Sequence, residues 1–211
     1  MIPCKYGEGG CPDDFADDFA ACARQAGPGC LGNNNLPKSI RQAKYKEDLM
    51  LIYLIQHADA LSEEENPARP LSEAGMRDIS KVAAYLSRVN VRVNQILYSK
   101  KLRARQTAEV IAKNLTFNSY KELAESDGLL PLDGPSAWDD RLKYLTDDLM
   151  LVGHMPHLGK LAGLLLCGDA DRNIISFQTA CVVCLERGEK ALWSLRWMIT
   201  PGIIFNAGPV S

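Results

Sequence analysis

One unbroken apolar run, residues 50–55, constrains the fold of this chain more than any other stretch. The sequence Met-Leu-Ile-Tyr-Leu-Ile contains no charged or amide side chain, which is typical of a strand buried on both faces of a parallel sheet. The run ends abruptly at Gln56 and His57. In open α/β sheets, ligands bind just beyond the carboxyl ends of the strands. We therefore expect residues 50–55 to form a central strand that places His57 at a functional edge.

Two later segments repeat this arrangement. Residues 93–98 form a second expected strand, and a basic segment with Arg103 in the first turn of a helix follows it. Residues 149–152 form a third expected strand, which is followed directly by Gly153 and His154. Three strand ends thus carry a histidine, an arginine and a second histidine.

The segments between these strands have the apolar spacing of helices. Ser72 is a good N-cap for a helix that reaches about residue 86. Further helices are expected at residues 102–115, 137–145 and 158–166, a short strand at 120–125, and a hairpin of strands at 180–186 and 191–198. Alternating strands and helices predict a three-layer α/β/α sandwich with a mainly parallel central sheet.

The order of the motifs resembles the histidine phosphatase superfamily, which has the phosphoglycerate mutase-like fold, and in particular its SixA-type phosphohistidine phosphatase branch. That family reads Arg-His-Gly after the first strand, Ser-Pro-x-x-Arg-Ala-x-Gln-Thr after the second, and a late Ser/Gly-His. The counterparts here are Gln56-His57-Ala58, Ser99-Lys-Lys-Leu-Arg103-Ala-Arg-Gln106-Thr107 and Gly153-His154; Arg69-Pro-Leu-Ser-Glu-Ala-Gly75 also matches a family motif, Arg-Pro-Leu-Thr-x-x-Gly. The resemblance covers roughly residues 50–201.

The resemblance implies catalytic roles for His57, Arg103 and His154, and phosphate binding by Gln56, Arg69 and Arg103. A neutral imidazole is a good nucleophile near pH 7, so His57 would attack phosphorus and become a phosphohistidine that water then hydrolyses. Phosphoryl transfer mainly needs positioning and charge neutralisation, which suits the planar guanidinium of Arg103. His154 would donate a hydrogen bond to a phosphate oxygen, more strongly if the ring is protonated.

Several positions depart from the family pattern or stay open. Gln56 replaces a family arginine and loses its charge, which predicts weaker phosphate binding unless Arg69 or Arg105 compensates. Arg105 is otherwise expected on the solvated side of its helix, and His157 at a helix cap or on the surface. No general acid is evident; the candidate carboxylates are those of Glu122, Glu125, Asp127 and Asp133.

The expected activity is that of a phosphohistidine phosphatase that dephosphorylates a protein of the histidine phosphotransfer type. A phosphoramidate needs a general acid less than an ester does, because imidazole can leave already protonated. One alternative is a general phosphomonoesterase that acts on small phosphate esters and uses one of the carboxylates as the acid. Another is a non-catalytic module that binds a phosphorylated protein and has lost turnover through Gln56.

Composition excludes several other classes of protein. The net charge of −2 gives no indication of a nucleic-acid partner, and the sequence has no apolar run long enough to predict a membrane partner. The cysteines lack the paired spacing of zinc sites, and no carboxylate cluster accompanies the histidines, so we expect no metal and no cofactor. The start of the chain lacks the pattern of a secretory signal, and we expect a cytoplasmic protein.

Residues 1–49 differ from the rest of the chain. They are rich in glycine and contain the acidic patch Asp13-Asp14-Phe-Ala-Asp17-Asp18 and a run of three asparagines. Family members start close to Met50. We therefore expect residues 1–49 to be an extension of unknown role and residues 50–211 to be the phosphatase domain.

Overall fold

The computed structural model describes residues 49–204, with secondary structure but not side chains at residues 118–122 and 189. The predicted extension therefore lies outside the described residues, apart from Leu49. One six-stranded sheet has the order β3-β2-β4-β1-β5-β6. Its strands are β1 (Met50–Gln56), β2 (Arg92–Tyr98), β3 (Thr116–Glu125), β4 (Leu149–Gly153), β5 (Val182–Arg187) and β6 (Trp193–Ile199).

The sheet is mainly parallel, as predicted. β1 pairs in parallel with β4, and β2 pairs in parallel with both β4 and β3. β5 and β6 form an antiparallel hairpin, and β5 is also antiparallel to β1. The register sets Gln56 opposite Gly153 and Tyr98 opposite Val152, so the carboxyl ends of β1, β4 and β2 lie next to one another.

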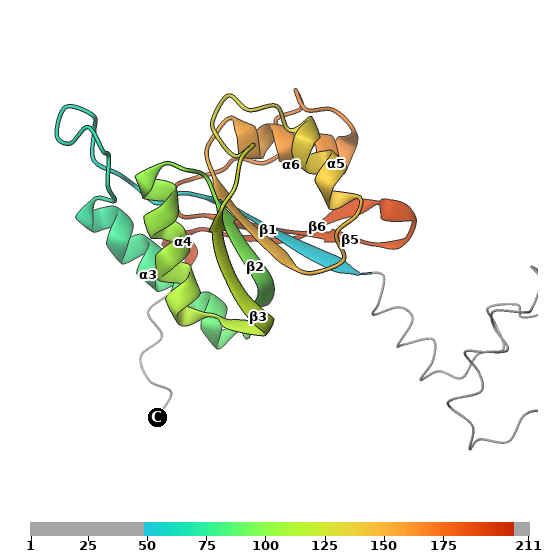
Figure 1. Cartoon of the computed structure of the whole chain (residues 1–211), viewed down its shortest axis with the longest axis horizontal. Coiled ribbons are helices and arrows are strands. Elements are labelled where there is room, and N and C mark those ends of the chain that lie inside the picture. The colour runs from blue at the N-terminus through green and yellow to red at the C-terminus, as the bar shows by residue number, and fades with distance from the viewer. Residues whose placement is uncertain (1–48, 205–211) are drawn as a thin grey trace, which may run out of the picture. The chain divides into compact units, whose positions relative to one another are not determined.

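Two helices cover each face of the sheet, which confirms the three-layer prediction (Figure 1). α3 (Glu73–Arg88) and α4 (Leu102–Asn114) lie on one face, and α5 (Ser136–Leu142) and α6 (His157–Cys167) lie on the other. The alternation of β1 explains why its whole run is apolar: Tyr53 and Ile55 belong to the core under α3 and α4, whereas Ile52 and Leu54 belong to the core under α5 and α6.

The structure corrects some of the predicted boundaries. β3 begins at Thr116, four residues before the predicted start, and it is an edge strand that pairs only with β2. The register of that pairing shifts between Val93 and Gln95, so the strand has no regular apolar alternation. The predicted hairpin forms, and its connection includes a short 3₁₀ helix, Glu189–Ala191.

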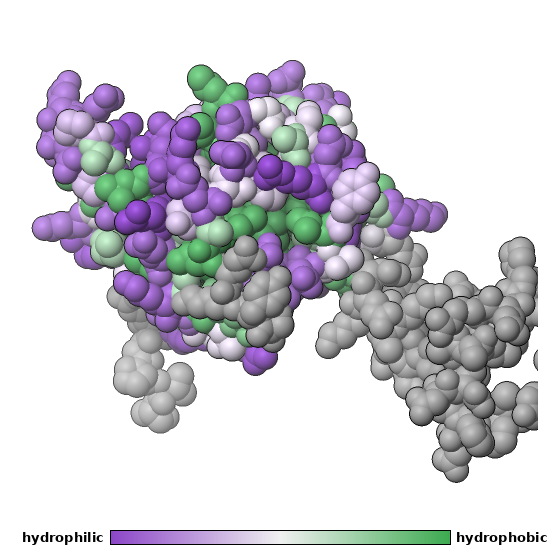
Figure 2. Space-filling view, viewed as in Figure 1, coloured by the Kyte–Doolittle hydropathy of each residue, from purple (hydrophilic) through white to green (hydrophobic). Residues whose placement is uncertain are grey.

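Most of the surface in Figure 2 is hydrophilic. Apolar side chains on this face gather in a band between the two helix layers, where an edge of the sheet reaches the surface (Figures 1 and 2). Helix α6 packs on β1 and β6, and α5 packs on α6. None of the helices among residues 49–204 is long and apolar enough to cross a membrane.

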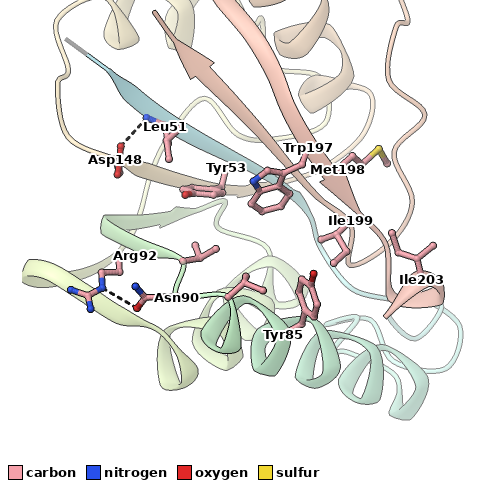
Figure 3. A pocket seen from close by; sticks show the side chains of 12 residues that line it. Leu51, Tyr53, Tyr85, Asn90, Arg92, Asp148, Trp197, Met198, Ile199 and Ile203 are labelled. Atoms are coloured by element: carbon pink, nitrogen blue, oxygen red, sulfur yellow. Dashed lines mark hydrogen bonds between the residues drawn. The ribbon is translucent and has the colours of Figure 1, made fainter. Parts of the chain in front are cut away.

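A groove of about 580 Å³ lies at the amino ends of the parallel strands (Figure 3). Leu51, Arg92 and Asp148, which stand at the starts of β1, β2 and β4, line it together with Tyr53 and Trp197, whose ring centroids are 5.8 Å apart. The carboxyl ends of the same strands lie at the opposite edge of the sheet. The groove is therefore separate from the edge where the sequence places the candidate catalytic residues.

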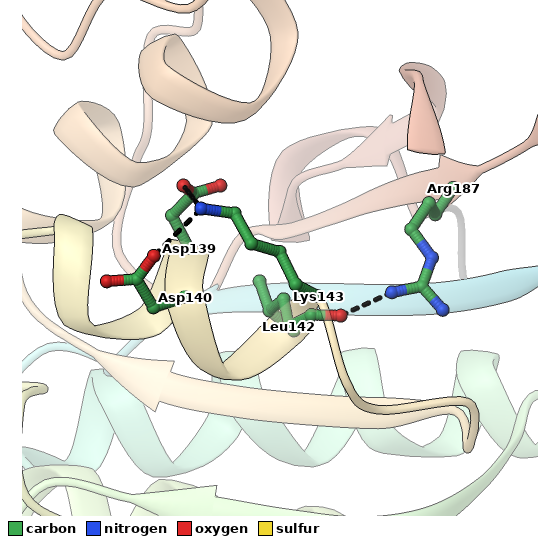
Figure 4. Close-up of polar contacts among 5 residues, drawn as sticks. All are labelled: Asp139, Asp140, Leu142, Lys143 and Arg187. Atoms are coloured by element: carbon green, nitrogen blue, oxygen red, sulfur yellow. Dashed lines mark hydrogen bonds and ion pairs between the residues drawn. The ribbon is translucent and has the colours of Figure 1, made fainter. Parts of the chain in front are cut away.

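Arg187, at the end of β5, connects the sheet to the end of α5 (Figure 4). Its guanidinium donates hydrogen bonds to the carbonyl oxygens of Leu142 and Leu145, the latter at 2.5 Å. Because the last carbonyl groups of a helix have no partner within the helix, a cation is favourable there. Lys143, in the same turn, pairs instead with the half-buried carboxylate of Asp139 and the exposed carboxylate of Asp140.

Candidate active site

The candidate site forms where the ends of β1, β4 and β2 meet. The backbone N–H of His57 donates to the Gly153 carbonyl at 3.1 Å, and the N–H of Ser99 donates to the Val152 carbonyl at 3.1 Å. These bonds extend the sheet ladder by one step beyond each strand. They hold the segments that carry His57, Ser99 and His154 in fixed positions relative to one another.

His57 is held in a defined tautomer. Its Nδ1 lies 2.7 Å from the carbonyl oxygen of Ala58. A carbonyl oxygen can only accept a hydrogen bond, so Nδ1 carries the hydrogen and Nε2 keeps its lone pair. The Nε of Arg103 donates to this Nε2 at 3.1 Å. Burial, and then the charges of Arg103 and Arg69, lower the pKa of His57 to about 4, although the Ala58 carbonyl acts in the other direction. The ring is therefore neutral at pH 7, with the lone pair of Nε2 facing a guanidinium.

Arg103 lies in the first turn of α4 and is 8% exposed. The hydroxyl of Thr107 donates to the Arg103 carbonyl at 2.7 Å and accepts from the backbone N–H of Ala58 at 3.0 Å. The neighbouring Gln106 accepts from the N–H of Leu71 at 2.8 Å. The Gln-Thr pair thus fixes the start of α4 against both ends of the loop that follows His57. The sequence motif contained this pair, but its residue types alone did not indicate what they would contact.

Arg69 lies in the loop between β1 and α3. Its Nε donates to the carbonyl of Leu61 at 3.1 Å, and its backbone has a positive φ of 48°. Its charge lowers the pKa of both His57 and Arg103, which places it in the electrostatic field of the site. Arg105 instead points away from the site and pairs with Glu109 at 3.1 Å on the exposed side of α4, as expected.

His154 lies beside His57, with ring centroids 4.8 Å apart and the planes tilted by 58°. It is 1% exposed, and its Nε2 is 2.5 Å from the hydroxyl oxygen of Ser99. Burial, followed by the nearby charges of His57 and Arg103, lowers the pKa of His154 to about 3. The ring is therefore neutral at pH 7, and a protonated His154, which the sequence left open, is disfavoured.

Gln56 stands at the end of β1 but has no hydrogen bond to the catalytic candidates. Its backbone carbonyl accepts from the N–H of Ala180 at 3.1 Å. Its side-chain oxygen Oε1 is buried and has no partner among residues 49–204. Gln56 thus lies close to His57 along the chain, but the structure shows no side-chain contact that could replace the family arginine.

The expectation for His157 is wrong. We expected a cap or a surface position, but His157 is the first residue of α6 and is fully buried. Its Nδ1 donates to the carbonyl oxygen of Asp133 at 2.9 Å. The loop before α5 folds over the start of α6 and offers that carbonyl as a partner, a long-range contact that the local sequence does not reveal.

None of the predicted general acids whose side chains are described contacts His57 or His154. Glu125 and Asp127 are exposed, and the carboxylate of Asp133 accepts from the N–H of Leu130 at 2.8 Å. The side chain of Glu122 lies outside the described part. The carboxylate that acts on the pKa of His57 is that of Asp59, two residues further along the chain, which also accepts from the hydroxyl of Ser72 at 2.5 Å.

The part of the chain between residues 49 and 204 contains no group of three or more His, Cys, Asp or Glu side chains that could hold a metal ion. The site as described is made of two neutral imidazoles, those of His57 and His154, and two arginines. This composition suits a dianionic group such as phosphate.

Similarity to known proteins identifies the family of this chain. The family model of the histidine phosphatase superfamily (branch 1) matches residues 52–130. An uncharacterized protein of Picosynechococcus is 32% identical over 146 residues, which cover 66% of this chain and 86% of that protein. The chain belongs to the histidine phosphatase superfamily. Within this superfamily, the phosphohistidine phosphatase SixA of Escherichia coli is 25% identical over 157 residues, or 72% of this chain and 94% of SixA.

Solved structures of the histidine phosphatase superfamily share the fold. A SixA structure in complex with tungstate has a TM-score of 0.63 at 24% identity and matches over 72% of this chain and 98% of its own length. A phosphoglycerate mutase from Bacillus anthracis has a TM-score of 0.50 at 12% identity, with 72% and 93% covered. At these identities, the two structures establish the phosphoglycerate mutase-like fold and nothing further.

Proposed function

We propose that the protein is a phosphatase that removes phosphate from a histidine-phosphorylated protein through a covalent phosphohistidine on His57. The observation that carries this proposal is the tautomer of His57. Its Nδ1 is occupied by the Ala58 carbonyl, and its Nε2 lone pair faces Arg103. A neutral imidazole held this way is ready to attack an electrophile that also binds a guanidinium.

In the first step, the Nε2 lone pair of His57 forms a bond to phosphorus while the bond from phosphorus to the leaving nitrogen breaks. Arg103 and Arg69 offset the negative charge of the equatorial oxygens, and His154 offers a hydrogen-bond donor on the same side. In the second step, water attacks the phosphohistidine, releases inorganic phosphate and restores the neutral ring. Arg103 is well placed for both steps because its Nε lies 3.1 Å from the Nε2 of His57.

The protein substrate is supported by two observations. The carboxylates of Glu125, Asp127 and Asp133 do not reach the histidine pair, and a phosphoramidate depends less on a general acid than an ester does. The related E. coli protein is described as a phosphohistidine phosphatase and matches along most of its length.

A substrate comparison tests the proposal. The purified full-length chain is given a histidine-phosphorylated phosphotransfer protein, a sugar phosphate and an aryl phosphate at matched concentrations. We expect kcat/KM to be highest for the phosphoprotein, no activity in His57→Ala, and normal activity in the surface control Arg105→Ala. Rapid quenching in base should trap an acid-labile label on the wild-type chain and none on His57→Ala.

Other results would favour one of the alternatives. A sugar phosphate turned over faster than the phosphoprotein would make the protein a small-molecule phosphomonoesterase. Binding of the phosphoprotein without release of phosphate from any of the three substrates would make it a binding module.

A further inference from the structure

Ser99 is the residue that contacts His154 inside the site. Ser99 follows β2 and is 1% exposed, as is His154 after β4. The hydroxyl oxygen of Ser99 lies 2.5 Å from Nε2 of His154, and the Ser99 backbone is fixed by its bond to Val152. Neither the predicted catalytic set nor the predicted phosphate-binding set contained Ser99, although it stands in the matched motif.

The hydrogen of the His154 ring can be assigned from its surroundings. The neutral ring carries one hydrogen, on Nδ1 or on Nε2. Nδ1 of His154 is buried and has no partner in the part of the chain that the structure describes. If Ser99 donated to Nε2, the hydrogen would sit on Nδ1 as a buried N–H without an acceptor, which is rare in proteins. With the hydrogen on Nε2, the hydroxyl oxygen of Ser99 accepts it and Nδ1 keeps an unpaired lone pair. The hydroxyl hydrogen of Ser99 then needs another acceptor, but unlike a ring N–H it can rotate to reach one.

The two nitrogens also differ in what they can reach. Nδ1 is enclosed by protein, so it cannot donate to a bound ligand. Nε2 is the nitrogen on the Ser99 side, and the His154 ring packs against that of His57. A phosphoryl group on His57 would therefore receive a hydrogen bond from His154 only through Nε2.

We propose that Ser99 is a positioning residue that keeps the hydrogen of His154 on Nε2 and aims it at the phosphoryl site. In the free protein, the Ser99 hydroxyl accepts this hydrogen bond and so holds the ring in its donor tautomer. When phosphate binds, one of its oxygens takes over as acceptor or shares the hydrogen with Ser99. That the acceptor is a phosphate oxygen rests on the proposed function. The tautomer of His154 is assigned from the structure alone.

The tautomer can be measured without catalysis. Nitrogen-15 NMR of histidine-labelled protein at pH 7, with His154→Gln for assignment, distinguishes a protonated from an unprotonated ring nitrogen. We expect Nε2 of His154 to be protonated and Nδ1 to be unprotonated in the wild-type chain. In Ser99→Ala we expect a mixture of tautomers, and in Ser99→Thr, which keeps a hydroxyl, the wild-type pattern. A hydrogen on Nδ1 in the wild-type chain overturns the proposal, even if Ser99→Ala does not fold.

Binding and turnover provide the second measurement. Losing one neutral hydrogen bond should weaken tungstate binding and lower kcat/KM by roughly two- to twelve-fold in Ser99→Ala, with recovery in Ser99→Thr. Ser87→Ala, on the exposed side of α3, is the matched control and should behave like the wild-type chain. Equal tungstate affinity in Ser99→Ala and the wild-type chain, with an unchanged tautomer, overturns the role of Ser99. If the wild-type chain turns over no phosphate substrate, the proposed function fails, whereas the NMR result still decides the tautomer.

Discussion

At the scale of single residues, the protonation of His57 controls whether a nucleophile is present. Burial lowers its pKa to about 4, from an ordinary value near 6.5. In the proposed mechanism the neutral form of His57 is the nucleophile, so activity should persist as the pH falls through 6.5 and be lost only near pH 4. NMR titration of the His57 ring in the free protein should give a midpoint near 4. A midpoint between 6 and 7 would contradict the buried, arginine-flanked position of the ring.

Two arginines, one near His57 and one on the surface, provide a matched pair for testing the phosphate site. Arg69 lies within the field of His57, whereas Arg105 is bound to Glu109 on the surface of α4. Arg69→Ala should weaken tungstate and phosphate binding on the order of tenfold, the low end of the range for a charge-assisted hydrogen bond. Arg105→Ala should change it by less than about twofold. Calorimetric titration measures both, and equal losses would show that only general positive charge matters.

Gln56 provides the third test at this scale. A family arginine here would make a charge-assisted bond to phosphate, and glutamine loses on the order of 1–2 kcal/mol if nothing compensates. Gln56→Arg should therefore raise kcat/KM roughly five- to thirty-fold and tighten vanadate binding. If the substitution lowers both quantities, the place of the arginine is already occupied, and Arg69 is the first candidate.

At the scale of the elements, the loop after β1 and the start of α3 are packed without free space. Ser72 caps α3 by accepting from the N–H of Gly75 at 2.9 Å. A Cβ atom on Gly75 would lie 2.0 Å from the carbonyl oxygen of Asp59, so either the backbone after His57 or the helix would have to move. This explains why the motif that starts at Arg69 ends in glycine.

Gly75→Ala should therefore destabilise the protein by on the order of 1–3 kcal/mol and reduce phosphate binding through the displaced loop. Gly202→Ala, where an added Cβ meets no atom within 4 Å, is the control and should remain close to wild type. Urea unfolding followed by circular dichroism gives both values. If the Gly75→Ala variant were as stable as the control, the loop after β1 could move to make room for the added methyl group without a loss of stability.

Local patterns explain which elements were predictable. The buried runs of β1, β2 and β4 and the Ser72 cap depend on neighbouring residues, so their sequence indicated both the sheet and the edge where His57 and His154 meet. The residues whose environment was missed depend on contacts with distant segments. The burial of His157 requires the Asp133 carbonyl, and the contact of Ser99 requires the ring of His154, 55 residues later. The apolar spacing of a single sequence does not indicate hydrogen-bond partners that lie so far apart along the chain.

At the scale of the whole molecule, the described domain accounts for most of the length of the relatives. The E. coli relative is covered over 94% of its length by 72% of this chain. A chain that begins at Met50 should therefore fold, unfold within a few degrees of the full-length chain, and bind tungstate with equal affinity. Differential scanning calorimetry and titration test this. Aggregation of the shortened chain, or a melting temperature many degrees lower, would make residues 1–49 part of the stable fold.

The position of β1 in the sheet also determines when the site can arise. β1 is the first strand of the described chain, but its two neighbours are β4 and β5, and the N–H of Leu51 bonds to a carboxylate 97 residues further along. Synthesis proceeds from the amino end, so a ribosome releases the apolar run of β1 long before either neighbour exists. Until then, its backbone and side chains have no sheet to join and remain open to chaperones or to other chains. The nascent protein therefore passes through this exposed stage before His57 and His154 can meet, because His154 follows β4.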